Sequence, residues 1–448
     1  MYEYLIIGGG ISGLYQAYLL QKQGVDFCLL EAESSTGGTW NSIKYQNSLY
    51  ELGPNTIIDS SPELQTLISE LGIEQEVLKS PLNKSTRYIY DQKRLKELKT
   101  NPLQLISSGL ISPLSILKIL TEPFRNKVSN KEESVREFAT RKFGKEVTHK
   151  LLETFLKGVW AGDPEKLSAS YALKFLVNLE NKYKSIFSGL ASQIFSKKDS
   201  KKKSIISFKS GLEFLTQEIA NQLKPNSIKL NSKVNSITKE SEHYIVTINN
   251  SESQIKTQKI IFANRAFEVA ELLTDLAPEL ARTLNQIEYA PIALLAYTLP
   301  KNKFSKALDG FGYLSANNDT ETLGTIWASE LFPERNLANE YICISFIGGA
   351  TNIKIKDQSQ EMIWDKVIQE HIKIYTEWSN GELQKEDFKL LNIKKISKAI
   401  PQLNLGHGGI IDKLTKLQKE QYQDFYFIGN YLDGVAIKDA LSSVKSCL

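Results

Sequence analysis

Cysteine and histidine are scarce in this chain of 448 residues. It has 3 Cys and 4 His, and neither type recurs at a spacing that could hold a metal ion. Cys28 and Cys343 lie in strand-like runs and Cys447 lies near the end of the chain. We therefore expect no structural disulfide, a reducing compartment and no metal site.

Long hydrophobic runs and an excess of one charge are also missing. No segment is apolar over enough residues to span a bilayer, and the net charge of +4 is too small to indicate a nucleic-acid partner. The first strand-like run begins almost at Met1, so we expect no leader peptide and a cytoplasmic protein. The length predicts two or three lobes rather than a single core.

Glycine, in contrast, is placed informatively. The opening stretch "YLIIGGGISGLYQAYLLQKQGVDFCLLEA" is typical of a buried strand, a glycine turn, a helix and a second strand. Gly8, Gly10 and Gly13 fit the pattern that admits a pyrophosphate at a helix N-terminus. Glu31 ends the second strand, where its carboxylate would accept hydrogen bonds from a ribose and repel a 2′-phosphate. The stretch predicts a dinucleotide site that excludes NADP; an ordinary glycine-rich turn is the alternative.

A second glycine pair distinguishes FAD from NAD. Gly37 and Gly38 follow the acidic residue in "EAESSTGGTW", an arrangement that resembles the FAD-binding amine-oxidase-like flavoproteins. The basic residue that usually follows such glycines is replaced here by Thr39 and Trp40. The final segment "DFYFIGNYLDGVAIKDAL" predicts a strand and then a helix beginning near Gly434, a second site for phosphate or flavin. It contains no Cys, so we expect the flavin to be bound non-covalently.

The segments between these ends predict two further lobes. Residues 228–263 read as a strand-rich meander that returns the chain to the first sheet, and residues 292–349 read as strands of a mixed sheet lining a cavity. Residues 133–160 have helical periodicity. The apolar stretch 101–124, broken by three prolines, predicts either short core helices or a patch that enters a membrane interface. The basic stretch 195–204 predicts a solvated loop or a contact with anionic lipid.

One segment resembles the signature of a narrower family. "FLKGVWAGDPEKLSASYAL" resembles the G-x-x-A-G-D-P-x-x-L-S signature of the protoporphyrinogen oxidase family. "LYELGPNTI", "LDGFGYL", "LGTIWASELFPER", "FIGGATN" and "IGNYLDGVAIKDAL" match that family in order, so the resemblance covers nearly the whole chain. It is nearer to the plant-mitochondrial branch than to the Gram-positive branch that oxidises coproporphyrinogen.

The resemblance implies a fold of class α/β + α. It combines a Rossmann-like flavoprotein domain with two dinucleotide-binding ends, a mixed-sheet substrate domain and an inserted helical membrane-binding domain. The implied boundaries are 1–70, 205–285 and 400–448 for the FAD domain, 71–83 and 286–399 for the substrate domain, and 84–196 for the helical domain. The residues expected to hold non-covalent FAD are Gly8, Gly10, Ile11, Ser12, Gly13, Glu31, Ala32, Gly37, Gly38, Thr39, Trp40, Gly53, Pro54, Asn55, Val234, Ala263, Gly429, Asn430, Gly434, Val435 and Ala436.

The same resemblance implies the substrate site. Arg87 matches an arginine that pairs with a substrate propionate, and a planar guanidinium suits that role. Leu314, Ile326 and Phe346 match the walls that enclose a flat macrocycle, and Gly158 matches a close backbone approach. Strand-core packing and a surface arginine are the alternatives. No His, Cys or carboxylate stands out as an acid–base catalyst, and His407 is expected to be structural.

The implied reaction is oxidation of protoporphyrinogen IX to protoporphyrin IX through FAD, with molecular oxygen as acceptor and hydrogen peroxide as product. The implied partners are the substrate, oxygen and the inner face of a membrane, with a homodimer and a ferrochelatase contact left open and nucleic acid excluded. Three alternatives remain: oxidation of coproporphyrinogen III, another amine-oxidase-like activity on amines or polyenes, and a non-catalytic porphyrin or flavin carrier.

Overall fold

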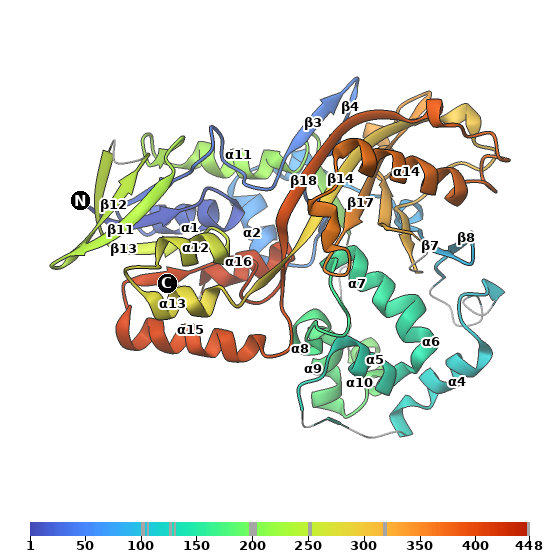
Figure 1. Cartoon of the computed structure of the whole chain (residues 1–448), viewed down its shortest axis with the longest axis horizontal. Helices are drawn as coiled ribbons and strands as arrows, with labels where there is room; N and C mark the ends of the chain where they lie inside the picture. Colours follow the sequence, from blue (N-terminus) through green and yellow to red (C-terminus); the bar gives the residue numbers. More distant parts are fainter. Residues whose placement is uncertain are drawn as a thin grey trace.

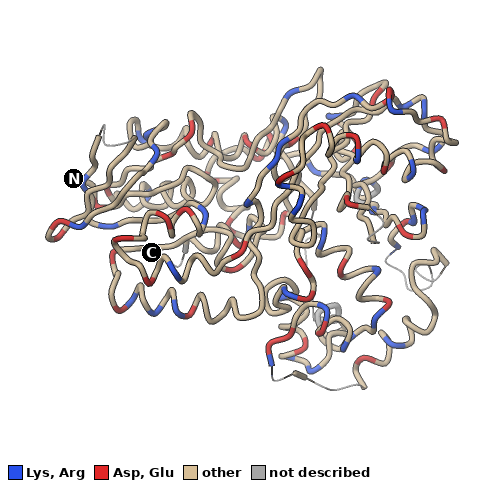
Figure 2. The backbone as a smooth tube through the Cα atoms, viewed as in Figure 1, with Lys and Arg blue, Asp and Glu red and all other residues tan. Residues whose placement is uncertain are grey.

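The computed structural model has two large sheets and a helical lobe (Figure 1). It describes residues 1–99, 104, 107–124, 128–129, 131–196, 204–249, 253–316 and 320–445. Basic and acidic residues are interspersed along the chain (Figure 2). Cys447 and most of the basic stretch 195–204 lie outside the described residues.

The first sheet contains the predicted dinucleotide unit. Its strands follow the order β10-β2-β1-β13-β12-β11, and β19 also pairs with β13. The pairs β10–β2, β2–β1, β1–β13 and β13–β19 are parallel, while β11 and β12 add the antiparallel meander. The chain therefore enters this sheet at its beginning and returns to it at its end. The bounds are β1 Tyr2–Ile7, β2 Phe27–Leu30, β10 Ile228–Lys229, β11 Val234–Glu240, β12 His243–Ile248, β13 Ser253–Phe262 and β19 Phe425–Phe427.

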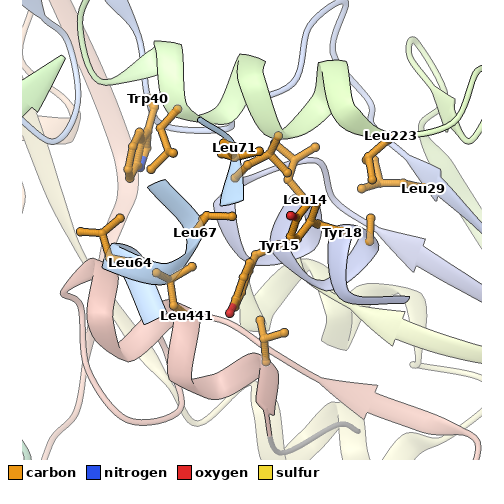
Figure 3. Packing of buried hydrophobic residues seen from close by; sticks show 14 of the residues in the cluster. Leu14, Tyr15, Tyr18, Leu29, Trp40, Leu64, Leu67, Leu71, Leu223 and Leu441 are labelled. Carbon is orange, nitrogen blue, oxygen red and sulfur yellow. The ribbon is translucent and has the colours of Figure 1, made fainter. Parts of the chain in front are cut away.

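Helix α1, Ile11–Lys22, lies in the core of this lobe, where Leu14, Tyr15 and Tyr18 pack against neighbouring helices (Figure 3). One of these neighbours, α2, spans Pro62–Glu70. The sequence predicts a helix over residues 59–71, capped by Ser60 or Ser61 and with Pro62 in its first turn. In the structure Ser61 is the cap and accepts a hydrogen bond from the Leu64 amide. Helices α11, Glu213–Gln222, and α16, Ile437–Lys445, complete the layer. These helices come from parts of the chain assigned to the FAD domain, but Leu71 and Ile73 of the same core belong to the range 71–83 that the sequence assigns to the substrate domain.

The second sheet has the order β18-β14-β17-β16-β15-β7-β8. All pairs are antiparallel except β15–β7. Helix α14, Gln360–Ile374, packs on one face, where its buried residues join those of the strands. The bounds are β7 Arg87–Asp91, β8 Arg94–Glu97, β14 Glu288–Pro300, β15 Gly312–Ser315, β16 Thr322–Trp327, β17 Glu340–Gly348 and β18 Lys389–Gln402.

The hairpin β7–β8 falls inside the range 84–196 that the sequence assigns to the helical domain, yet it forms the edge of the second sheet. Tyr88 and Tyr90 bury their side chains in the core of that sheet, which holds the hairpin there. The stretch "STRYIYDQKRL" predicts a hairpin that turns around Asp91 and Gln92. The turn lies one residue later, at Gln92 and Lys93, which both have positive φ. The structure therefore places β7, which begins with the expected propionate-binding residue, in the same sheet as the strands that carry the expected macrocycle-contacting residues.

The helical lobe follows the hairpin. Gly144, with φ +85°, divides the predicted long helical stretch into α5 and a second segment that runs through a π-helical turn at Thr148–Leu152 into α7. Buried ion pairs from Lys142 to Glu122 and Glu180 hold the lobe together. Within the described ranges, no helix is long and apolar enough to cross a bilayer. The helices are α4 Pro113–Leu120, α5 Val135–Phe143, α6 Lys145–Val147, α7 Glu153–Trp160, α8 Ala169–Ala172, α9 Lys174–Tyr183 and α10 Ile186–Ser196.

Candidate flavin and substrate site

The glycine loop between β1 and α1 has the geometry of a pyrophosphate cradle. A Cβ at Gly13 would lie 2.0 Å from the Gly8 carbonyl oxygen, so only glycine lets α1 pack this closely against the end of β1. Gly8 has φ +111°, which a side chain would strain. A Cβ at Gly10 would meet no described atom within 4 Å, so the space above this residue is open to a ligand. Ile11 and Ser12 follow as the first residues of α1 and present free amides there.

Glu31 is held beside this loop. One carboxylate oxygen accepts the Gly9 amide at 2.7 Å and the other accepts the Glu33 amide at 2.9 Å. A carboxylate has about four acceptor positions, so a ribose diol can still bind. The sequence pattern does not require glycine at position 9, but a Cβ there would lie 2.8 Å from the carboxylate. Gly9 is thus a site residue that sequence reasoning missed, and its only signal was the run of three glycines.

The second glycine pair packs directly on the first loop. Gly37 donates its amide to the Gly9 carbonyl at 2.9 Å, and a Cβ at Gly38 would lie 3.2 Å from the Gly10 Cα. Gly53 is equally constrained, because its Cβ would lie 2.0 Å from the Thr39 carbonyl oxygen. This contact places Gly53, and with it the neighbouring Pro54 and Asn55, beside the loop.

Trp40 and Thr39 differ in what they offer a cofactor. The Trp40 side chain is buried among Leu64, Leu67 and their neighbours (Figure 3), so only its backbone faces the loop region. Thr39 and Ala32 are exposed. Contacts from these three positions to FAD stay predictions.

The C-terminal unit meets the same sheet. Ala263 follows β13 and donates its amide to the Ile7 carbonyl at 2.9 Å, and Val234 begins β11. Gly429, with φ +139°, and the half-buried Asn430 follow β19. Helix α16 begins at Ile437 rather than near Gly434, because Asp439 turns back, accepts the Ala436 amide at 3.2 Å and lies against Gly434. Burial raises the pKa of the Asp439 carboxyl.

These features fit a bound dinucleotide. The turn after Ala263 lies against Gly8, and the Oδ1 atom of Asn264 in that turn is buried with no hydrogen-bond partner among the described residues. A buried acceptor without a partner costs about 1–3 kcal/mol, which a ligand hydroxyl or amide would offset. Asn264 is a second site residue that sequence reasoning missed.

The second sheet presents an open face that contains the expected substrate residues. Register pairs Arg87 with Gly312, Gly312 with Ile326, Leu314 with Gly324, and Gly324 with Phe346. Since paired residues share a face, all four expected substrate side chains lie on one side of β7, β15, β16 and β17. They are half-buried, whereas the intervening residues Tyr88, Tyr313, Thr325 and Ser345 are buried on the other side.

Two positions at the centre of this face carry no side chain, because they are glycines. Gly312 and Gly324 lie between the four side chains, and a Cβ at either would collide with backbone oxygen, at 2.0 and 2.5 Å. Helix α7 approaches at the rim, where Gly158 is exposed and its Cβ would lie 2.6 Å from Leu314 Cδ2. Sequence reasoning matched Gly158 but not the two sheet glycines, whose signal was their place in "GFGYL" and "LGTIW".

Arg87 is the cation of this face. Its guanidinium lies 4.9 Å from the centre of the Phe311 ring, and no described carboxylate forms an ion pair with it. Burial lowers the pKa of the Arg87 guanidinium, but arginine remains charged near neutral pH. A half-buried guanidinium without a carboxylate partner can bind an anionic group of a ligand.

Comparisons with known proteins agree with this geometry. The family model for flavin containing amine oxidoreductases matches residues 11–446. The chain belongs to that family. Protoporphyrinogen oxidase 2, chloroplastic/mitochondrial, of Arabidopsis thaliana is 28% identical over 98% of this chain and 91% of its own length. Coproporphyrinogen III oxidase of Bacillus subtilis is 23% identical over 99% of this chain and 96% of its own. Among solved structures, cyclohexylamine oxidase of Brevibacterium oxydans superimposes with a TM-score of 0.69 at 13% identity, covering 100% of this chain and 97% of that one.

This flavin amine oxidoreductase is therefore an FAD-dependent oxidoreductase with the predicted fold. Its histidines offer no general base at the open face. His371 and His407 are buried, and burial lowers the pKa of His371 to about 4 and that of His407 below its usual range. His407 contacts the Leu432 carbonyl and the Tyr171 ring edge, and His149 is half-exposed beside Glu153. Cys28 and Cys343 are buried free thiols, and burial raises the pKa of the Cys28 thiol to about 11.

Proposed function

We propose that this enzyme oxidises protoporphyrinogen IX to protoporphyrin IX, with molecular oxygen as the final acceptor. The observation that carries the proposal is this face of the second sheet, where the half-buried apolar side chains Leu314, Ile326 and Phe346 share one side with a single guanidinium. A large, flat, apolar ring with acidic side chains is complementary to such a surface. A small amine would leave most of the surface uncovered.

The chain's own residues act by positioning. Arg87 binds a propionate with two parallel hydrogen bonds, which fixes the ring in its own plane. Leu314, Ile326 and Phe346 contact the ring and exclude water from it, and Gly158 admits the ring edge beside α7. A bound flavin would supply the acceptor for two electrons in each cycle, so that each cycle removes two hydrogens from the substrate.

The overall reaction needs three cycles. Protoporphyrinogen IX loses six hydrogens, three molecules of oxygen take them up, and three molecules of hydrogen peroxide leave with protoporphyrin IX. No described His or Cys is placed to act as a base on the open face. Aromatisation of the macrocycle supplies the driving force that lets the reaction proceed without one.

Coproporphyrinogen III is the second candidate substrate, since a relative named for that activity is 23% identical to this chain. The relatives named protoporphyrinogen oxidase from Arabidopsis thaliana and Nicotiana tabacum are 28% identical, which favours the first candidate. Coproporphyrinogen carries four propionates where protoporphyrinogen carries two, and Arg87 is the one described arginine on the open face.

The test is to give the purified enzyme both porphyrinogens in parallel and to follow porphyrin fluorescence in air. We expect fast oxidation of protoporphyrinogen IX, slow oxidation of coproporphyrinogen III and release of hydrogen peroxide. Faster oxidation of coproporphyrinogen III would leave the proposed flavin chemistry in place but assign the enzyme to the branch that oxidises coproporphyrinogen. An enzyme that binds flavin and oxidises neither would overturn the proposal.

We further propose that the enzyme is cytoplasmic and rests on the inner face of the membrane through α4. Leu114, Leu117 and Leu120 of α4 are 62%, 56% and 49% exposed, and the nearby Phe124 is 86% exposed. These positions recur near the helical period, so they form one apolar face. Such a face suits shallow insertion at a lipid interface, next to a substrate that is itself poorly soluble in water. A homodimer and a contact with ferrochelatase stay open as further partners.

A further inference from the structure

Lys394 is a half-buried lysine of β18, at the end of the second sheet away from Arg87. The register pairs Phe346 with Leu294, and Leu294 with Lys394, so the Lys394 side chain lies on the same side of the sheet as the expected substrate residues. The next residue, Lys395, points to the opposite side. Of these two adjacent lysines, only Lys394 shares a side with the substrate residues.

The Lys394 ammonium lies beside backbone that adjoins the glycine loops. Its Nζ atom donates to the Leu52 carbonyl at 3.1 Å. The next residue, Gly53, packs against Thr39, whose carbonyl oxygen would lie 2.0 Å from a Cβ at Gly53. Thr39 follows the second glycine pair, at the place where flavoproteins of this kind usually have a basic residue and this chain has none. Lys394 therefore brings a cation close to a position that the local sequence leaves uncharged.

These contacts follow the direction in which a bound FAD would extend. The Glu31 carboxylate marks the ribose end, and the glycine loop at Gly10 marks the pyrophosphate. From the glycine pair that packs on this loop, the contacts lead to Lys394, and Leu52 packs in the same apolar cluster as Phe346. The flavin ring must reach the substrate to accept electrons from it. The ring therefore belongs on this path, between the glycine loop and the substrate face.

Lys394 also lacks an anionic partner. Among the residues that the structure describes, no carboxylate forms an ion pair with it, and the Leu52 carbonyl accepts one of its three N–H donors. Burial lowers the pKa of Lys394 from 10.5, and the positive charge of Arg265, which itself pairs with Glu268, lowers it further. A half-buried cation near a second cation is unfavourable unless a negative charge joins it.

We propose that the Lys394 ammonium lies against the ring of bound FAD and stabilises the negative charge that the ring gains on reduction. A hydride adds two electrons and one proton to the neutral ring, which leaves it an anion with its charge at N1 and the adjoining carbonyl oxygen. A nearby cation favours this anion over the oxidised ring and so raises the reduction potential of the flavin. The inference rests on the FAD-dependent chemistry and not on the identity of the substrate.

The test examines the flavin of the purified holoenzyme in the absence of any porphyrinogen. Lys394→Met removes the charge, Lys394→Gln removes it but keeps a donor for the Leu52 carbonyl, and Lys394→Arg retains it. Lys395→Met is the matched control, because Lys395 donates to the Gln358 carbonyl on the opposite side of the sheet. Dye-coupled reduction gives the reduction potential. Titration with sulfite, which adds to the oxidised ring and leaves a negative charge on it, gives a Kd.

We expect both uncharged variants, Lys394→Met and Lys394→Gln, to shift the equilibrium toward oxidised flavin about tenfold, a fall of about 30 mV for a two-electron couple. Their Kd for sulfite should rise by about the same factor, because the sulfite adduct carries the same charge as the reduced ring. Lys394→Arg and Lys395→Met should stay close to the wild type in both measurements.

Unchanged potential and sulfite Kd in both uncharged variants would overturn the inference, and so would equal changes in Lys395→Met. Loss of flavin from the uncharged variants, with a normal potential in the fraction that keeps it or with flavin retained only in Lys394→Arg, would assign the cation to binding of the pyrophosphate instead. An enzyme that oxidises neither porphyrinogen would contradict the proposed function without altering these measurements, so the two failures are distinguishable.

Discussion

At the scale of single residues, the candidate site contains glycines that the backbone packing requires and a side chain whose role depends on a ligand. Gly13 and Gly53 are fixed by backbone oxygens 2.0 Å from where a Cβ would be, whatever the ligand. Arg87 is different, because its guanidinium meets only an aromatic ring among the contacts described and forms no ion pair with a described carboxylate. An anionic ligand would supply the partner that this guanidinium lacks among the described carboxylates.

Arg87→Ala should therefore lower kcat/KM for protoporphyrinogen IX ~10- to 100-fold, chiefly through KM, because a charge-assisted contact contributes about 1.5–3 kcal/mol. Steady-state kinetics measure the change. Arg94→Ala is the matched control: Arg94 lies on the same hairpin, is 70% exposed and pairs with Glu377, so its loss should leave the kinetics unchanged. Unchanged kcat/KM in Arg87→Ala would remove the positioning role.

At the scale of elements, the strand register places the expected substrate side chains on one face of the second sheet. A single side chain of α14 joins three of the strands from beneath: His371 Nε2 lies 2.8 Å from the Tyr313 hydroxyl, 2.8 Å from the Thr325 hydroxyl and 3.2 Å from the Ser345 hydroxyl. Its Nδ1 donates to the Val367 carbonyl at 2.7 Å. Burial lowers the pKa of His371 to about 4, so the ring is neutral near pH 7 and Nε2 accepts from these hydroxyls. These three residues alternate with the expected walls on the opposite face of the same strands.

This arrangement predicts a pH dependence of stability. Burial lowers the pKa of His371 from 6.5 to about 4, so between these values the unfolded chain binds a proton that the folded chain does not. His371 makes its full contribution to the free energy of unfolding above pH 6.5. This contribution is lost as the pH falls toward 4, by about 3 kcal/mol in all. Urea unfolding at pH 7.5 and pH 5 should show about 2 kcal/mol of this loss in the wild type and a smaller loss in His371→Gln. The variant His149→Gln, at a half-exposed histidine, should lose as much stability as the wild type. An equal loss between the two pH values in all three proteins would exclude His371 as the cause of the pH dependence.

At the scale of the whole molecule, what the sequence could predict was what local patterns encode. The βαβ unit with Glu31, the strands from 288 to 348 and the capped helix α2 all follow from spacing within a few residues. The placement of β7 beside β15 could not be read in this way, because that parallel pair joins distant segments and depends on buried tyrosines from both. Gly9, Gly312 and Gly324 were missed because each is defined by its contact with another strand or loop, and Asn264 was missed because only the fold shows that its Oδ1 atom is buried without a partner among the described residues.

The helical lobe completes the molecule, and its apolar face gives a last prediction. Leu117 in α4 and Phe124, which follows the end of α4, are 56% and 86% exposed, and burying each in lipid would contribute about 1.5–3 kcal/mol. The double variant Leu117→Ser, Phe124→Ser should therefore bind phosphatidylglycerol-containing vesicles at least ~10-fold more weakly in a co-sedimentation assay. Ile353→Ser with Met362→Ser is the control, since these residues are 57% and 60% exposed but belong to the substrate lobe. Turnover of detergent-solubilised substrate should be equal in all three proteins, because α4 contributes nothing to the open face; equal vesicle binding would mean that the lobe meets another partner through α4.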